Sequence, residues 1–186
     1  PCKKEKRVLS REEQARFVSY LLEDMDTCKF GVLLALFTGV RIGELCALQW
    51  GKISLKEQTI RIDATLQRLR DTSAVGSART RIVISTPKSD TSVRTIPVTD
   101  YTAELCGKMA PHSSAAYVLT GTDSFMEPRA LQYRMEKYTR KCGLEGVHFH
   151  TLRHTFATRA VEVRFEIKSL SEVLGHSPAC GQAASG

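Results

Sequence analysis

The sequence has no long hydrophobic run. Its longest apolar stretch, residues 32–37, is far shorter than the roughly 20 residues that a membrane-spanning helix needs. The first residues, PCKKEKR, are not followed by the apolar segment of a secretory signal. Internal repeats and linker-like stretches are also lacking. These absences lead us to expect a cytoplasmic protein without a membrane partner.

Closely spaced cysteine pairs are also missing. The six cysteines are Cys2, Cys28, Cys46, Cys106, Cys142 and Cys180. None lies within a few residues of another, so the sequence has no CxxC unit for a metal or for redox chemistry. We expect reduced thiols with structural roles.

The composition is that of a single globular domain with a basic excess. Of the 186 residues, 42% are hydrophobic and 25% are charged, which suits one folded domain with a core. Lysine and arginine number 27 against 20 acidic residues, giving a net charge of +7. This excess favours a polyanionic partner, and nucleic acid is the leading candidate.

Three helices are predicted in the first quarter of the chain. The first, SREEQARFVSYLLEDM, begins with Ser10 as a candidate N-cap and has Glu13 three residues later, the spacing of a capping box. The second, KFGVLLALFTG, is apolar on nearly all sides and ends at Gly39, as a buried helix with a glycine cap does. The third, RIGELCAL, is short and is expected to bury Ile42 and Leu45.

The rest of the chain is predicted to alternate between strands and helices. Apolar alternation over residues 52–62 indicates a β-hairpin, and RIVIST and VRTIPV on either side of PKSDTS indicate a second one. Four helical patterns follow: DYTAELCGKM, EPRALQYRMEKYTRKCG, which Pro128 opens and Gly143 stops, HTLRHTFATRAVE and EIKSLSEVLG. We therefore expect a mixed α+β fold, mainly helical, with a small antiparallel β-sheet of roughly three to five strands.

The stretch HTLRH places two histidines one helical turn apart. His150 and His154 have the spacing of a zinc clamp. However, the zinc-hydrolase motif HExxH has a glutamate between its histidines, and here Arg153 would repel a dication and attract a phosphate. An anion pocket is the favoured interpretation, with no metal. His150, at the helix start, is the better candidate for contact with a substrate, and His154 is expected to be a hydrogen-bonded structural residue.

Other basic residues are scattered along the chain. Arg41 follows the Thr38 to Val40 turn at a helix start, with Glu44 three residues later; Lys88 lies at the expected tip of the second hairpin; His176 follows Gly175 at the end of the last helical pattern. Taken singly, each is compatible with a solvated surface residue, and an exposed Arg41–Glu44 pair would contribute under about 1 kcal/mol.

Together, these segments form a pattern that is specific for one protein family. TGVRIGEL, PKSDTSVRTIPV, HTLRHTFAT and LGH, in this order over residues 9–177, resemble the catalytic domain of the tyrosine recombinases, the phage-integrase family. The resemblance implies that fold and no cofactor. It also implies a set of catalytic residues, with Glu44 supporting the first arginine: Arg41, Lys88, His150, Arg153 and His176.

The implied reaction is site-specific DNA recombination, of which DNA integration is one form, without a metal. A tyrosine attacks a phosphodiester of double-stranded DNA, forms a 3′-phosphotyrosyl link and releases a 5′-hydroxyl. Arg41 and Arg153 would meet the charge that grows on the nonbridging oxygens. Lys88 would protonate the leaving 5′-oxygen, a general-acid role. Family members assemble as tetramers on DNA.

The sequence departs from the family pattern at the nucleophile. Where the family's tyrosine is expected after LGH, this sequence has Ser185 and Gly186. All five tyrosines precede His150: Tyr20, Tyr101, Tyr117, Tyr133 and Tyr138. We therefore expect a phosphate pocket that does not form the covalent intermediate by itself.

The expected organisation is a catalytic domain over residues 1–177 without the family's N-terminal core-binding domain, followed by an irregular tail over residues 178–186. We expect this chain alone to be monomeric. Alternatives stay open: a relative that only binds DNA, a type IB topoisomerase-like enzyme and, as an outsider, a metal hydrolase.

Overall fold

The first helix begins where the sequence predicts. The computed structural model describes residues 6–70, 80–85, 93–163 and 173–174, and helix α1 covers Arg11–Leu22. The Ser10 hydroxyl accepts from the Glu13 backbone N–H at 3.1 Å, and the Glu13 carboxylate accepts from the Ser10 N–H at 2.8 Å. These reciprocal bonds form the predicted capping box, which satisfies two N–H groups that a helix start leaves without partners.

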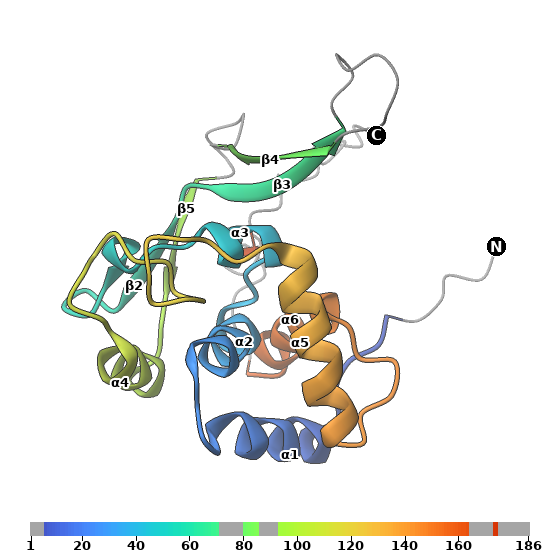
Figure 1. Ribbon diagram of the computed structural model, residues 1–186. Helices are drawn as coiled ribbons and strands as arrows, with labels where there is room; N and C mark the ends of the chain where they lie inside the picture. The colour runs from blue at the N-terminus through green and yellow to red at the C-terminus, as the bar shows by residue number, and fades with distance from the viewer. Residues whose placement is uncertain (1–5, 71–79, 86–92, 164–172, 175–186) are drawn as a thin grey trace, which may run out of the picture.

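Helix α2 is the centre of the core. It covers Thr27–Thr38, and nearly all of its residues from Phe30 onward are buried. It packs against α1 and against helices α4, α5 and α6 of the later chain (Figure 1). Because neighbours surround it, the helix is apolar on all sides, as the sequence predicts. Among the described residues, no helix is both long and apolar enough to cross a membrane.

The remaining helices match the predicted segments. Their bounds are α3 Ile42–Ala47, α4 Asp100–Met109, α5 Pro128–Lys141 and α6 Phe149–Glu162; the 3-10 turn η1, Trp50–Lys52, was not predicted. Proline stands at the first position of α5, where its missing N–H costs nothing. In the last predicted helix, EIKSLSEVLG, only Val173 and Leu174 lie within the described residues, and both are helical.

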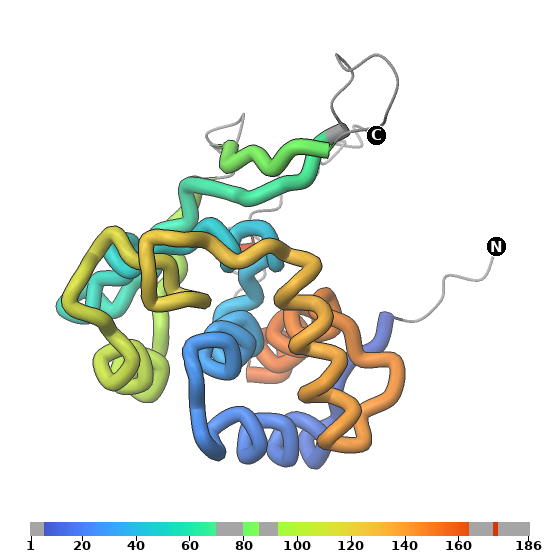
Figure 2. Tube along the Cα trace, in the orientation of Figure 1, coloured from blue at the N-terminus to red at the C-terminus, as the bar shows by residue number. Residues whose placement is uncertain are grey.

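The strands form two small antiparallel sheets. Strands β1 (Ile53–Ser54), β2 (Thr59–Ile62) and β5 (Arg94–Pro97) form one sheet in the order β1-β2-β5. Strands β3 (Thr65–Arg70) and β4 (Thr80–Ser85) pair with each other in the second. The tube view shows the β3–β4 ribbon above the helical body (Figure 2).

The first predicted hairpin is confirmed by the pairing of β1 with β2. The second is wrong in its pairing. RIVIST, which forms β4, pairs with β3, whereas VRTIPV, which forms β5, pairs with β2. The physical reason is that β5 alternates buried and exposed residues and covers the core beside β2, with Ile96 opposite Ile60. The predicted fold class, mainly helical with a small amount of antiparallel β-structure, is confirmed, but the described strands form two sheets and not the single sheet predicted.

Candidate phosphate-binding site

A tight turn joins the central helix to Arg41. Gly39 ends α2 with φ of 68°, a left-handed conformation that glycine adopts without strain. A Cβ atom at this position would lie 2.6 Å from Phe156 and 2.9 Å from Leu174. The turn therefore needs glycine for its backbone and for its space, and it places Arg41 as the N-cap residue of α3.

Glu44 holds Arg41 at both its backbone and its side chain. The carboxylate accepts the Arg41 backbone N–H at 2.8 Å and its Nη1 at 2.9 Å. Glu44 is 7% exposed, whereas the Arg41 side chain is 37% exposed. The pair therefore fixes a partly exposed guanidinium upon a buried carboxylate, which differs from a solvated surface pair.

Helix α3 lies very close to strand β3 beside this pair. A Cβ atom at Gly43 would stand 2.7 Å from the Leu66 carbonyl oxygen and 2.7 Å from the Thr65 hydroxyl. The glycine of RIGEL therefore allows the strand to approach the first turn of α3, which brings β3 next to Arg41.

Arg94, which the sequence analysis did not single out, completes the cluster. It lies on β5, is 8% exposed, and donates from Nη1 and Nη2 to Glu44 at 2.9 and 2.8 Å. Its Nε donates to the Val173 carbonyl at 2.6 Å. Burial raises the pKa of Glu44, but the hydrogen bonds and charge of Arg94, together with Arg41, outweigh burial and lower it overall.

Arg153 reaches the same region from α6. Arg153 is 6% exposed, and its guanidinium donates from Nη1 to the Gly39 carbonyl at 2.7 Å and from Nη2 to the Leu174 carbonyl at 2.5 Å. Burial lowers the pKa of Arg153 to about 10, assisted by the charges of Arg41 and Arg94 and opposed by that of Glu44. The four side chains are thus close enough to interact, and an anion among the guanidiniums would relieve their repulsion.

The two histidines of HTLRH differ in their surroundings. His150 is exposed in the first turn of α6, and its ring centroid lies 5.9 Å from that of the half-buried His154. The pKa of His154 is lowered by burial first and then by the charges of Lys6, His150 and Arg153. No hydrogen bond joins the His154 imidazole to another described residue, so its expected hydrogen-bonded role is not found in this part of the chain.

A zinc clamp finds no support in the described part of the chain. No three histidine, cysteine, aspartate or glutamate residues gather there as metal ligands. The nearby Arg153 guanidinium is also the wrong charge for a cation site.

Arg41 and His150 line one cavity. Its volume is about 570 Å³, and it lies between α3, the β3–β4 ribbon and the first turns of α5 and α6. The other polar residues around it are Thr65, Gln67, Arg68, Glu127, Arg129 and Gln132. Arg68 forms an ion pair with Glu127 at 2.6 Å. The cavity therefore places Arg41, the partly exposed member of the arginine cluster, and the exposed imidazole of His150 on one lining surface with Arg68 and Arg129.

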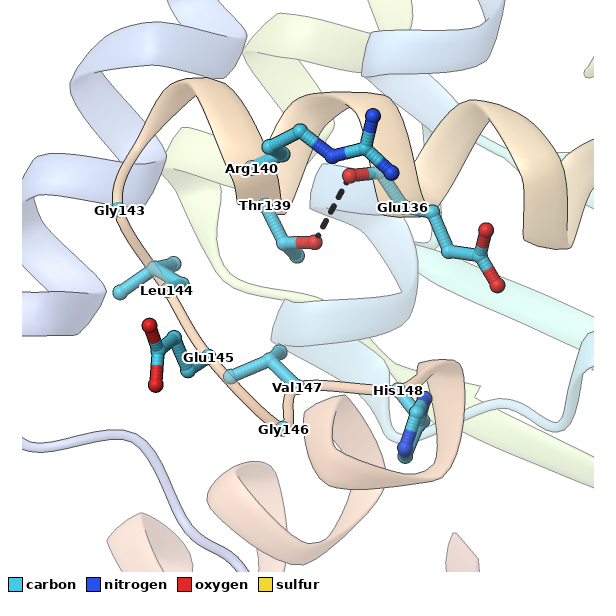
Figure 3. A pocket seen from close by; sticks show the side chains of 9 residues that line it. All are labelled: Glu136, Thr139, Arg140, Gly143, Leu144, Glu145, Gly146, Val147 and His148. Carbon is cyan, nitrogen blue, oxygen red and sulfur yellow. Dashed lines mark hydrogen bonds between the residues drawn. The ribbon is translucent and has the colours of Figure 1, made fainter.

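A second hollow, of about 390 Å³, lies where α5 leads into α6. Figure 3 shows its lining, with the Thr139 hydroxyl donating to the Glu136 carbonyl. The lining includes the carboxylates of Glu136 and Glu145 but none of the arginines of the cluster. With two carboxylates against the single arginine Arg140, this hollow is a poorer place for a phosphate than the cavity at Arg41.

The structure brings together four of the six residues that the resemblance implies: Arg41, Glu44, His150 and Arg153. Lys88 and His176 lie outside the described residues. In the sequence, Lys88 falls between β4 and β5, and His176 comes two residues after Leu174, whose carbonyl Arg153 holds.

This chain is similar to known proteins of one family. Residues 7–179 match the model of the phage integrase family. A tyrosine recombinase XerC-like protein of Caldanaerobacter subterraneus subsp. tengcongensis is 26% identical over 164 residues, covering 78% of this chain and 41% of that protein. Tyrosine recombinase XerA of Thermococcus kodakarensis is 28% identical over 177 residues, covering 92% of this chain and 54% of that protein.

Solved structures show the same fold. The Tn1549 transposon integrase in complex with transposon right end DNA superposes with a TM-score of 0.73 at 22% identity, over 94% of this chain and 59% of that one. XerA recombinase superposes with a TM-score of 0.68 at 22% identity, over 95% of this chain and 57% of that one. The chain spans about half the length of the curated relatives that it matches. By the match over residues 7–179, the chain belongs to the phage integrase family.

Proposed function

We propose that this chain binds a DNA phosphodiester at the arginine cluster and serves in site-specific recombination through a 3′-phosphotyrosine intermediate. The observation that carries the proposal is the placement of Arg41, which the buried Glu44 holds at a cavity that His150 also lines. Membership of the phage integrase family supports the same reaction class.

In this proposal, Arg41 and Arg153 stabilise the charge that develops on the nonbridging phosphate oxygens. A preorganised donor of this kind contributes about 3 to 4 kcal/mol to lowering a reaction barrier. The carbonyls of Gly39 and Leu174 fix the plane of the Arg153 guanidinium, so little reorganisation is needed when the phosphate arrives. His150 assists transfer of the tyrosine proton.

Lys88 and His176 enter the proposal through the resemblance alone. Lys88 protonates the leaving 5′-oxygen, and general-acid catalysis of this kind contributes roughly 10²- to 10⁴-fold. His176 donates a hydrogen bond to the phosphate.

We further propose that none of the five tyrosines of this chain is the nucleophile. None of them lines the cavity shared by Arg41 and His150. The most buried, Tyr138, packs against Tyr20 at a ring-centroid distance of 5.9 Å. We therefore propose that this chain supplies the phosphate pocket of the reaction and that none of its own tyrosines becomes attached to DNA. A covalent adduct between this polypeptide and a suicide DNA substrate would contradict it.

Binding is tested by fluorescence anisotropy with a short labelled duplex over a range of salt concentrations. Arg41→Met is expected to weaken binding about tenfold, the loss of one charge-assisted hydrogen bond, and to reduce the salt dependence by about one phosphate contact. The matched control is Arg140→Met, at an exposed position in the last turn of α5. Equal affinities of the two variants would refute the assignment of Arg41.

A further inference from the structure

The Glu44 carboxylate is shared evenly by two arginines. Oε1 accepts from Arg41 Nη1 and from Arg94 Nη1, both at 2.9 Å. Oε2 accepts from the Arg41 backbone N–H and from Arg94 Nη2, both at 2.8 Å. Each oxygen therefore has one bond to each arginine, and Arg94 supplies the two-pronged contact that sets the plane of the carboxylate.

Arg94 also connects three separate parts of the chain. From β5, its Nη atoms reach α3, and its Nε donates to the carbonyl of Val173. The next carbonyl, that of Leu174, accepts from Arg153. Two buried arginines therefore hold two consecutive carbonyls in the segment that leads to His176.

We infer that Arg94 is a positioning residue, which orients the Glu44 carboxylate so that Arg41 is held at the phosphate-binding cavity. The inference rests on the proposed function of Arg41. The Arg41 side chain is 37% exposed and that of Arg94 is 6% exposed, so packing immobilises Arg94 far more than Arg41. Arg94 therefore restrains the Glu44 carboxylate through two hydrogen bonds, and Glu44 in turn restrains Arg41.

Stability alone does not account for this buried ion pair. Moving two charges out of water is costly, and well-packed apolar residues at such a place are often as stabilising or more so. A fixed carboxylate below a phosphate-binding arginine supplies what an apolar pair cannot, because it orients the guanidinium through directed hydrogen bonds.

Lysine is a demanding test of this role. It keeps the positive charge, but its ammonium is a point charge without the planar fork that bonds both carboxylate oxygens and the Val173 carbonyl. Arg94→Lys is therefore expected to fold, which urea unfolding checks, and to leave Glu44 less well oriented. Arg94→Gln, which leaves the Glu44 carboxylate in place but lacks the two-pronged guanidinium contact, is the second variant should Arg94→Lys not fold.

The first readout is affinity for the short labelled duplex. Arg94→Lys is expected to weaken binding at least roughly threefold through coupling to Arg41, while the double variant Arg41→Met/Arg94→Lys binds no more weakly than Arg41→Met alone. A merely structural Arg94 would instead give losses that add. Arg140→Met again serves as the control.

The second readout is the ¹⁵N–¹H signal of the Arg41 Nε group, assigned by its disappearance in Arg41→Met. Arg94→Lys, or the second variant in its place, is expected to shift or broaden this signal before DNA is added. An unchanged signal, or additive losses of affinity, would overturn the inference while leaving the role of Arg41 intact. If Arg41→Met itself binds DNA normally, it is the proposed function that fails.

Discussion

Arg153 donates from Nη1 to the carbonyl oxygen of Gly39 at 2.7 Å, a bond between residues 114 positions apart. It joins helix α6 to the residue that ends α2, two positions before Arg41. The Arg153 guanidinium, which we assign to phosphate binding, therefore also stabilises the contact between α6 and the end of α2. Its substitution is expected to affect both stability and DNA affinity.

Arg153→Ala is expected to lower the free energy of unfolding by about 3 kcal/mol, because two buried carbonyls lose a charged donor. DNA affinity falls as well. Urea unfolding and anisotropy measure the two effects. Arg140→Ala, at an exposed position, is expected to change stability by less than about 0.5 kcal/mol. A fully stable Arg153→Ala variant would show that the bonds to Gly39 and Leu174 contribute little.

Gly43→Ala is expected to destabilise the protein by about 1 to 3 kcal/mol, the cost of overpacking. The added methyl would meet the backbone carbonyl of Leu66 at 2.7 Å, and moving that carbonyl means separating α3 from β3. Gly107→Ala in α4 is the matched control, because its new methyl finds only Leu55 at 3.8 Å. Thermal unfolding compares the two. Equal effects of both substitutions would argue against close packing at Gly43.

Glu44 gives a dependence of stability on pH. Its pKa in the folded state lies below the ordinary 4.5, since Arg94 and Arg41 outweigh the effect of burial. The stability that the ionised carboxylate contributes is therefore complete above pH 4.5 and is lost as the pH falls through the lowered pKa. The difference in unfolding free energy between the native protein and Glu44→Gln is expected to shrink over that acidic range.

Urea titrations at a series of pH values measure this difference, with Glu104→Gln, from an exposed pair with Lys108, as the control. A difference that stays constant from neutral to strongly acidic pH would contradict the lowered pKa of Glu44.

His154 is expected to titrate below the ordinary pKa of 6.5, because burial and the nearby positive charges disfavour its protonated form. NMR of the imidazole C–H signals measures the titration midpoint. Substituting His150→Gln removes one of the charges and is expected to raise the pKa of His154, whereas Lys137→Gln on α5 leaves it unchanged. A His154 midpoint above 6.5 would be inconsistent with the described surroundings.

Local signals were sufficient to predict the helices. The Ser10 and Glu13 capping box, the Gly39 cap and Pro128 each act within one turn of the helix that they bound. Strand pairing depends on segments far apart in the chain. The partners of RIVIST and VRTIPV could therefore not be predicted from the fact that these two segments are close together in the sequence. Two strands near each other in sequence joined different sheets.

Only part of the site could be predicted, because some of its contacts also join segments that are far apart in the chain. Arg41, Glu44, His150 and Arg153 stand in recognisable motifs, whereas no motif within VRTIPV marks Arg94 as a site residue. One signal was present: Arg94 shares the inward face of an alternating strand with Ile96. An arginine at an inward position must find a carboxylate or carbonyls, since a buried charge without partners is costly. Its partners, Glu44 and Val173, lie 50 and 79 residues away.

Because these bonds join residues that are far apart in the chain, the partners are synthesised at different times. During synthesis, the arginines emerge before the carbonyls of Val173 and Leu174 that they hold. A nascent chain that stops short of these residues carries the motifs without the completed cluster. The bonds of Arg94 and Arg153 to these two carbonyls are therefore the last of the cluster to form, because Val173 and Leu174 are made after the strand and the helices that they join.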